Sequence, residues 1–168
     1  DGSCIDNIDD EGCAALFGDF QGDGTICAEV VCVPCVECED TEGEPICGPD
    51  YEDTYNGGCN SAVPVFSPIE CGEPICGGSG TYLFQGSNYR DTDWYEYVST
   101  EPLFFTWEAT ANFPLLIFII DGNAGCGGLV IINSLSVPPC QTATLTTPEC
   151  TAPGTYWFDW QVGGSAAS

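Results

Sequence analysis

Residues 155–162 read Thr-Tyr-Trp-Phe-Asp-Trp-Gln-Val, and this stretch decides the fold class. The side chains at its even-numbered positions are all apolar or aromatic, whereas those at its odd-numbered positions are more polar. This alternation is the two-residue period of a β-strand. Residues 103–109 repeat the pattern, because Phe105, Trp107 and Ala109 share one face there. Both stretches predict strands with one strongly apolar face.

Short β-prone runs of this kind alternate with Gly, Pro, Asn and Asp breaks from Thr81 onward, which is typical of an antiparallel β-sandwich or jelly roll. The seven expected strands are residues 81–85, 94–99, 103–109, 115–120, 129–133, 142–146 and 155–162. The chain then runs into a Gly/Ser/Ala sequence at 163–168. We therefore expect a sandwich that is one strand short, with an open edge near residues 155–162.

Composition divides the chain near Ser67. Residues 1–67 hold 16 acidic residues, eight Cys and five aromatics, whereas residues 68–168 hold ten, five and fifteen. This contrast predicts an acidic, Cys-rich N-terminal arm at 1–67 and a β-sandwich domain at 68–168. One short helix is expected in the arm, beginning at Asn7. The acidic run at 37–53 is interpreted as a solvated loop.

The charge balance excludes several classes of function. The chain has 26 acidic residues, one basic residue and no His, for a net charge of -25. Nucleic acids and anionic membranes are poor partners for such a chain, and catalysis or zinc binding through His is impossible. A pair of carboxylates could hydrolyse glycosides only in a larger cleft than this fold offers, so we expect no enzyme. The apolar run 114–120 is too short to insert into a membrane.

Thirteen Cys in 168 residues indicate a disulfide framework made in an oxidising compartment, so we expect a secreted protein. The sequence at Asp1 lacks the features of a signal peptide, which suggests a mature chain. The C-x2-C-x2-C run at 32–38 favours structural disulfides over a metal or redox site. The repeated sequence Gly-Glu-Pro-Ile-Cys-Gly at 43–48 and 72–77 is interpreted as a turn that places a half-cystine.

Twelve of the Cys are expected in disulfides, and plausible local pairs are Cys71 with Cys76 and Cys126 with Cys140. Because thirteen is odd, we expect Cys150 to be free or bonded to another chain. Pairing between the arm and the sandwich would change this assignment. The twelve are Cys4, Cys13, Cys27, Cys32, Cys35, Cys38, Cys47, Cys59, Cys71, Cys76, Cys126 and Cys140.

Three stretches carry a family resemblance: Arg-Asp-Thr-Asp-Trp-Tyr-Glu-Tyr at 90–97, Phe-Pro-Leu-Leu-Ile-Phe-Ile-Ile-Asp-Gly at 113–122 and Pro-Gly-Thr-Tyr-Trp-Phe at 153–158. Together they resemble bacterial pre-peptidase C-terminal-like domains over about residues 70–162. The resemblance implies a β-sandwich module of secreted bacterial proteins without an active site. Residues 2–35 look like a Cys-rich repeat of secreted bacterial surface proteins.

Two pairs of Asp are candidate Ca²⁺ ligands. Asp19 and Asp23 occupy positions one and five of a possible calcium loop, but position twelve is Val30 instead of Glu, so a Gly-rich turn is the alternative. Asp91 and Asp93 form the second pair, and the alternative there is that they satisfy backbone groups or a salt bridge with Arg90. The sequence predicts no cofactor, and Ca²⁺ at these Asp pairs is the alternative.

The leading functional hypothesis is a structural subunit of a secreted bacterial fibre, in which identical subunits polymerise head to tail. The β-prone segment 25–33 of one arm would add to the sheet edge of the next subunit near 155–162. The expected interface residues are Thr25, Ile26, Ala28, Val30, Val31, Val33, Tyr156, Trp157, Phe158 and Trp160. The alternative is an extracellular module that binds cell-surface glycans or adheres through Ca²⁺, with Trp157 as a possible glycan contact.

Overall fold

The computed structural model describes residues 22, 26, 35–45, 47–48 and 51–163, and all regular secondary structure among them is β. The strands are β1 (Ser67–Pro68), β2 (Thr81–Phe84), β3 (Ser87–Arg90), β4 (Thr92–Ser99), β5 (Thr106–Ala109), β6 (Leu115–Asp121), β7 (Val130–Val137), β8 (Ala143–Thr146) and β9 (Gly154–Val162). The mainly-β prediction is therefore confirmed. The helix expected from Asn7 lies outside the described residues, as does the segment 25–33 apart from Ile26.

Each of the seven expected strands overlaps a strand of the structure, whereas β1 and β3 were not anticipated. Strand β3 pairs with β2 in a hairpin whose turn contains Gln85 and Gly86, both with positive φ. The sequence Ser-Asn-Tyr-Arg of β3 lacks a run of apolar residues, so the two-residue period gave no signal there.

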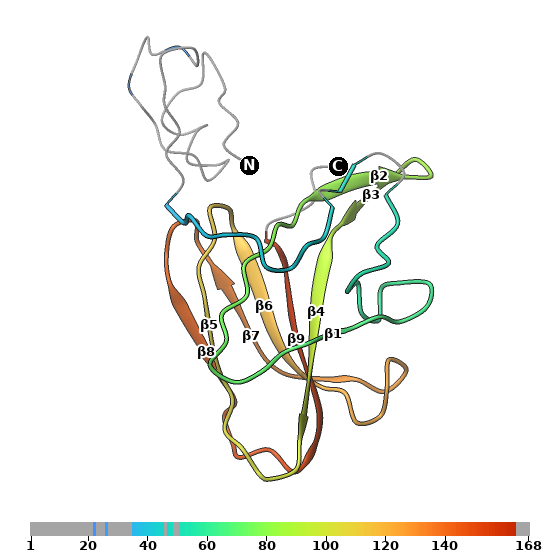
Figure 1. The fold of residues 1–168 in the computed structure, drawn as a ribbon, viewed down its shortest axis with the longest axis vertical. Helices are drawn as coiled ribbons and strands as arrows, with labels where there is room; N and C mark the ends of the chain where they lie inside the picture. The colour runs from blue at the N-terminus through green and yellow to red at the C-terminus, as the bar shows by residue number, and fades with distance from the viewer. Residues whose placement is uncertain (1–21, 23–25, 27–34, 46, 49–50, 164–168) are drawn as a thin grey trace.

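The largest sheet has five strands in the order β1-β4-β9-β6-β7 (Figure 1). Strand β9 lies at its centre, where it pairs antiparallel with β4 on one side and with β6 on the other. Strand β7 closes one end by pairing with β6, and the two-residue β1 runs parallel to β4 at the other end.

A separate pair of strands, β5 and β8, covers one face of this sheet and encloses the main apolar core. Phe105, just before β5, packs its ring against Tyr156 and Phe158 of β9 at centroid distances of 4.9 and 5.3 Å. Ile117 and Ile119 of β6 are completely buried in the same core. The predicted alternation along β5 is correct, since Phe105 points inward and Phe104 is exposed.

The opposite face of the five-stranded sheet has a smaller core. Trp94, Ile120 and Trp157 form it, and the ring of Phe66 stacks on Trp157 with their centroids 4.5 Å apart. The disulfide Cys59–Cys126 joins two of the loops that cover this face, and both Cys pack against the three buried side chains. The central sheet is consequently buried on both of its faces.

This arrangement contradicts the expected open edge at residues 155–162. Both sides of β9 are hydrogen-bonded within the chain, so β9 has no free edge to accept another strand. Three of its expected interface residues, Tyr156, Trp157 and Phe158, are at most 6% exposed. Trp157 was expected on a more polar, accessible face, but Phe66 and the Cys59–Cys126 loops cover that face. It therefore cannot stack against a glycan.

The local disulfide pairs predicted from the sequence are also wrong. The structure pairs Cys35 with Cys140, Cys38 with Cys76 and Cys59 with Cys126. Each bond joins a residue before Ser67 to a residue after it. Cys47, Cys71 and Cys150 have free thiols, although the first two were expected in disulfides.

Three disulfides in the described part are typical of a protein that matures in an oxidising, extracellular environment. The described residues include no helix with the length and apolar character needed to cross a membrane.

Gly58 provides a test of the smaller core. Its φ is +53°, and a Cβ added there would lie 2.1 Å from Cγ of Trp94. We expect Gly58→Ala to lower the free energy of unfolding by about 2–4 kcal/mol, the sum of backbone strain and overpacking. Gly72→Ala is the matched control, because Gly72 has a φ of +81° but open space around it, and it should lose only about 1 kcal/mol. Equal losses in urea unfolding would contradict this account of the core.

Candidate metal centre

The acidic segment 35–45 is held against the start of β4 by several contacts. The disulfide Cys38–Cys76 fixes one end of it, and the backbone N–H groups of Thr41 and Glu42 both donate to the carbonyl of Cys76. The Oδ1 atom of Asp40 accepts the N–H groups of Glu42 and Gly43 and so forms a tight turn. Exposure alternates over residues 41–45, where Glu42 and Glu44 are the partly buried positions.

Five carboxylates meet where this segment passes β4, and we call them the acidic site. They form two groups of three that share Glu44, and within each group one oxygen per residue lies within 4.8 Å of the others. The first group is Glu42, Glu44 and Asp93 of β4. The second is Glu44, Asp53 and Asp91, which precedes β4.

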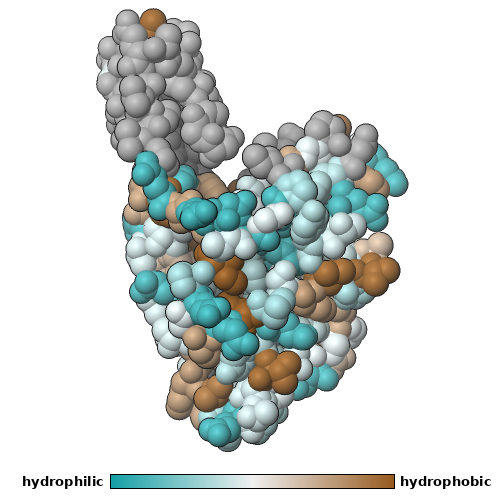
Figure 2. Space-filling view, in the orientation of Figure 1, coloured by the Kyte–Doolittle hydropathy of each residue, from teal (hydrophilic) through white to brown (hydrophobic). Residues whose placement is uncertain are grey.

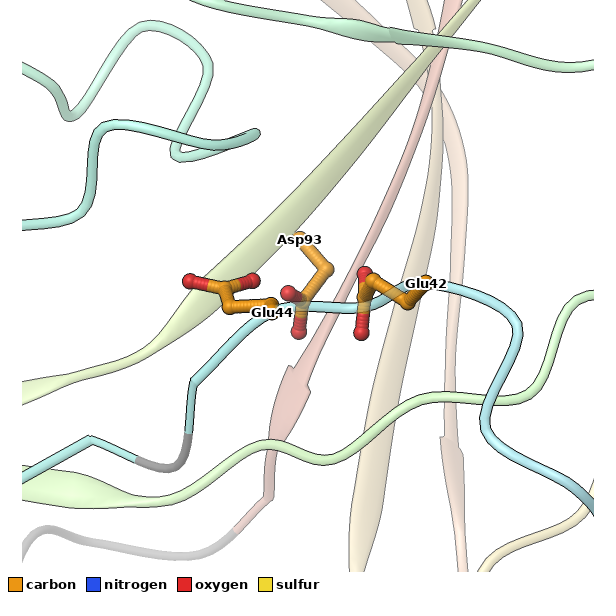
Figure 3. Close-up of side chains that lie close together, drawn as sticks. All are labelled: Glu42, Glu44 and Asp93. Carbon is orange, nitrogen blue, oxygen red and sulfur yellow. The ribbon is translucent and has the colours of Figure 1, made fainter.

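Asp93 is the most deeply buried member of the acidic site. Its side chain has no exposed surface, and no donor from the backbone or from a neutral side chain of the described residues reaches its carboxylate oxygens, whose one side-chain hydrogen bond is with the carboxyl group of Glu44 and requires a shared proton. In the close-up of Figure 3 it projects from β4, with Glu44 to one side of it and Glu42 to the other. Because an unpartnered buried carboxylate is costly, this arrangement needs a compensating proton or cation.

The remaining members turn some of their oxygens toward donors. Tyr95 Oη and Asn56 Nδ2 donate to Glu42 Oε1, and Tyr51 Oη donates to Glu44 Oε1. Asp53 Oδ1 accepts the backbone N–H groups of Tyr55 and Asn56. The other buried oxygens have no hydrogen-bond partner, and they are Glu42 Oε2, Glu44 Oε2, Asp53 Oδ2 and Asp91 Oδ1, together with Asn56 Oδ1.

Burial and mutual repulsion raise three pKa values in the acidic site. Burial, followed by the charges of Asp53 and Glu42, raises the pKa of Asp91 to about 7. Burial, with the charges of Asp91 and Asp53, raises the pKa of Glu44 to about 8. Burial is also the main reason that the pKa of Asp93 rises to about 11, with Glu42 and Asp91 adding to it. Each shift favours the neutral carboxylic acid in the folded protein.

The donor chemistry of the acidic site suits a hard cation. All of its candidate ligand atoms are oxygens, which Ca²⁺ and Mg²⁺ prefer and which zinc and copper do not select. Two oxygens on opposite sides of a Ca²⁺ ion are about 4.6–5.2 Å apart, since Ca–O distances are about 2.3–2.6 Å. The three oxygens of each group are close enough to reach one such ion.

The structure thus brings together one of the two Asp pairs considered from the sequence, Asp91 and Asp93. Asp19 and Asp23 lie outside the described residues. Sequence reasoning missed Glu42, Glu44 and Asp53, which it assigned to a solvated loop. The only local signal was the alternation of Glu42 and Glu44, because residues two apart lie on one side of an extended chain.

The expected interface residues are divided between buried and undescribed positions. Ile26 is 47% exposed, and the five other members between 25 and 33 lie outside the described residues. Trp160 is partly buried and donates its Nε1–H to Tyr95 Oη, so it supports the acidic site from within the main core. Cys150 is exposed in the loop before β9.

No family model matches this chain, and no curated protein or solved structure matches it significantly. The resemblance to pre-peptidase C-terminal-like domains therefore stays a prediction.

The raised pKa values predict how stability depends on pH in the metal-free protein. The folded state binds protons more tightly than the unfolded chain, so stability is greatest near pH 4 and falls as the pH rises toward the folded-state pKa values of about 7, 8 and 11. In a chelator, we expect urea unfolding to show a loss of about 2 kcal/mol or more between about pH 5 and pH 8. A flat or rising profile would contradict the burial of these carboxylates.

Asp159 provides the matched control, because it is a buried acid on the opposite face of the sheet. It is 4% exposed, and burial raises its pKa to about 8. Asp159→Asn and Asp93→Asn should each remove part of the pH dependence. Their effects should add, since the two residues do not share partners.

Proposed function

We propose that this chain is an extracellular, non-enzymatic β-sandwich module that binds Ca²⁺ at the acidic site. The observation that carries the proposal is the side chain of Asp93, which is fully buried and is reached by no described donor other than a proton shared with Glu44. Two further carboxylates, Glu42 and Glu44, have an oxygen close to it. At neutral pH outside a cell, Ca²⁺ is the abundant divalent cation that can stabilise these three residues in their ionised form.

Ca²⁺ is favoured over Mg²⁺ by the number of protein oxygens. Mg²⁺ usually keeps several waters and takes one or two carboxylates, whereas Ca²⁺ accepts six to eight oxygen ligands in flexible geometry. The acidic site offers five carboxylates and the unpartnered Oδ1 of Asn56, whose Nδ2 already donates to Glu42. The chain has only one basic side chain, Arg90, against 26 acids, so protein cations cannot neutralise the acidic site fully.

The ion would have a structural role. Glu42, Glu44 and Asp53 belong to the segment that precedes the strands, whereas Asp91 and Asp93 belong to the start of β4. Without a cation these two sets repel each other, and with Ca²⁺ they share ligands of one centre. Ca²⁺ would thus fasten residues 42–53 to the sheet, which is a means to make an adhesive or structural module dependent on extracellular Ca²⁺.

Binding should appear first as thermal stabilisation. At pH 7.5, Ca²⁺ at about 100 times its dissociation constant should add about 2.7 kcal/mol to the free energy of unfolding. For a chain of this size we expect a rise in Tm of about 5–10 °C over the chelated protein, at constant ionic strength. Differential scanning calorimetry measures it, and Mg²⁺ should produce a smaller rise.

Three variants make this test specific. Asp93→Asn should abolish the Ca²⁺-dependent rise, yet in a chelator at pH 7.5 it should be more stable than the parent protein, because Asn does not have to take up a proton on folding as Asp93 does. Asp159→Asn and the exposed Glu37→Gln should keep the full response to Ca²⁺. An equal response in Asp93→Asn, or no response in the parent protein, would contradict Ca²⁺ binding at the acidic site.

A second candidate function is a subunit of an extracellular homopolymer, and the edge of the five-stranded sheet favours it. Strand β7 pairs with β6 on one side, and no described strand pairs with its other side. Val130 and Ile131 of β7 are 59% and 52% exposed. An unpaired strand edge with apolar side chains is the usual acceptor for strand addition.

The face drawn in Figure 2 offers no continuous apolar docking surface, because its apolar side chains lie in separate patches.

In this version, the β-prone sequence 25–33 of a second copy would pair with β7. Because the net charge of -25 makes subunits repel one another, salt and Ca²⁺ should promote assembly.

Light scattering of the non-reduced protein tests the homopolymer. With Ca²⁺ present we expect a molar mass many times 17.8 kDa that rises with protein concentration. Ile131→Lys should return the mass to that of one chain, because a Lys in the edge strand opposes strand addition. Val63→Lys is the control at another exposed apolar position and should still assemble. A constant mass of one chain, or assembly that survives Ile131→Lys, would overturn this candidate.

A further inference from the structure

We propose that the acidic site holds two Ca²⁺ ions that share Glu44 as a bridging ligand, one ion against Asp93 and the other against Asp91. This inference rests on the proposed Ca²⁺ binding and goes beyond it by assigning the number of ions and the ligands of each.

The geometry separates the two ion positions. Glu42, Glu44 and Asp93 form one compact group of ligand oxygens, and Glu44, Asp53 and Asp91 form the other. Glu44 is the only residue present in both groups. No donor among the described residues reaches its buried Oε2, while its Oε1 accepts the Tyr51 hydroxyl, and a cation would replace the proton that its carboxyl group can share with Asp93.

Each group also contains, in its most deeply buried Asp, a carboxylate oxygen that no hydrogen-bond donor of the described chain reaches. In the first group both oxygens of Asp93 are in this state, at zero exposure of the side chain. In the second group it is Oδ1 of Asp91, which is 2% exposed. A single ion bound to Asp93 would leave the carboxylate of Asp91 without a cation. A single ion bound to Asp91 would leave the carboxylate of Asp93 without one.

The charge of the acidic site also favours two ions. Its five carboxylates carry five negative charges when ionised, and one Ca²⁺ neutralises two of them. Three negative charges would then remain in a largely buried cluster, and a second ion reduces the remainder to one. Glu44 lies between the groups, where it can attract both ions and screen their mutual repulsion.

Equilibrium dialysis of the intact, disulfide-bonded chain against Ca²⁺ counts the ions. We expect two per chain in the parent protein and one in either Asp93→Asn or Asp53→Asn. Asn at position 53 keeps the Oδ1 atom that accepts the N–H groups of Tyr55 and Asn56, so this variant should fold. Glu44→Gln should weaken both ions by about tenfold or more, and the exposed Glu37→Gln should retain two ions of unchanged affinity. Circular dichroism and thermal unfolding in a chelator establish that each variant is folded.

The outcomes distinguish this inference from the function on which it rests. Binding of one ion per chain that is lost in both Asp93→Asn and Asp53→Asn would overturn the two-ion site but leave Ca²⁺ binding intact. Two ions in Asp53→Asn would also overturn it, since the second ion would then lie elsewhere. No binding in the parent protein would overturn both proposals.

Discussion

The rest of the structure depends on how five carboxylates can lie together in a chain with one basic residue. The acidic site brings Glu42, Glu44 and Asp53 against the start of β4, and Asp93 is fully buried there with no described donor other than a proton shared with Glu44. Hydrogen bonds from Tyr95 and Asn56 compensate only one oxygen of Glu42. Either protons or cations must supply the missing positive charge: in the cation-free protein the raised pKa values of Asp93 and Glu44 keep these groups protonated near neutral pH, and a bound cation would take the place of those protons. This charge balance makes cation binding the function that the geometry supports best.

Disulfides and the apolar cores hold the acidic site together against this repulsion. Cys38–Cys76 lies at one end of the segment that carries Glu42 and Glu44, and Cys59–Cys126 fixes the loops over Trp94 and Trp157. On the other face of the sheet, Trp160 donates to Tyr95, which in turn donates to Glu42. The main core therefore contributes directly to the orientation of a metal-ligand candidate. A covalent framework of this kind helps a cluster of carboxyl groups to stay together in the folded chain.

Local periodicity was sufficient to predict seven of the nine described strands, because each of these contains a short β-prone run, whereas β1 and β3 do not. It could not predict that β9 is central. The sequence of β9 does not reveal that Phe66 packs on Trp157 and buries the second face of the strand. Disulfide pairing failed for a related reason. Proximity in sequence favoured the pair Cys71–Cys76, whereas the folded chain places Cys38 beside Cys76.

Of the acidic site, Asp91 and Asp93 could be recognised, but Glu42, Glu44 and Asp53 join them only through tertiary contacts. The repeated hexapeptide gave no guide either, because Glu44 of the first copy enters the site and Glu73 of the second is exposed.

The central claim is tested most directly by diffraction from crystals of the disulfide-bonded protein grown at neutral pH with Ca²⁺, with anomalous scattering recorded to locate the ions. The account predicts two anomalous peaks within about 2.3–2.6 Å of carboxylate oxygens. One would be bounded by Glu42, Glu44 and Asp93, and the other by Glu44, Asp53 and Asp91. Density that shows these carboxyl groups hydrogen-bonded to one another, with no peak among them at saturating Ca²⁺, would contradict it.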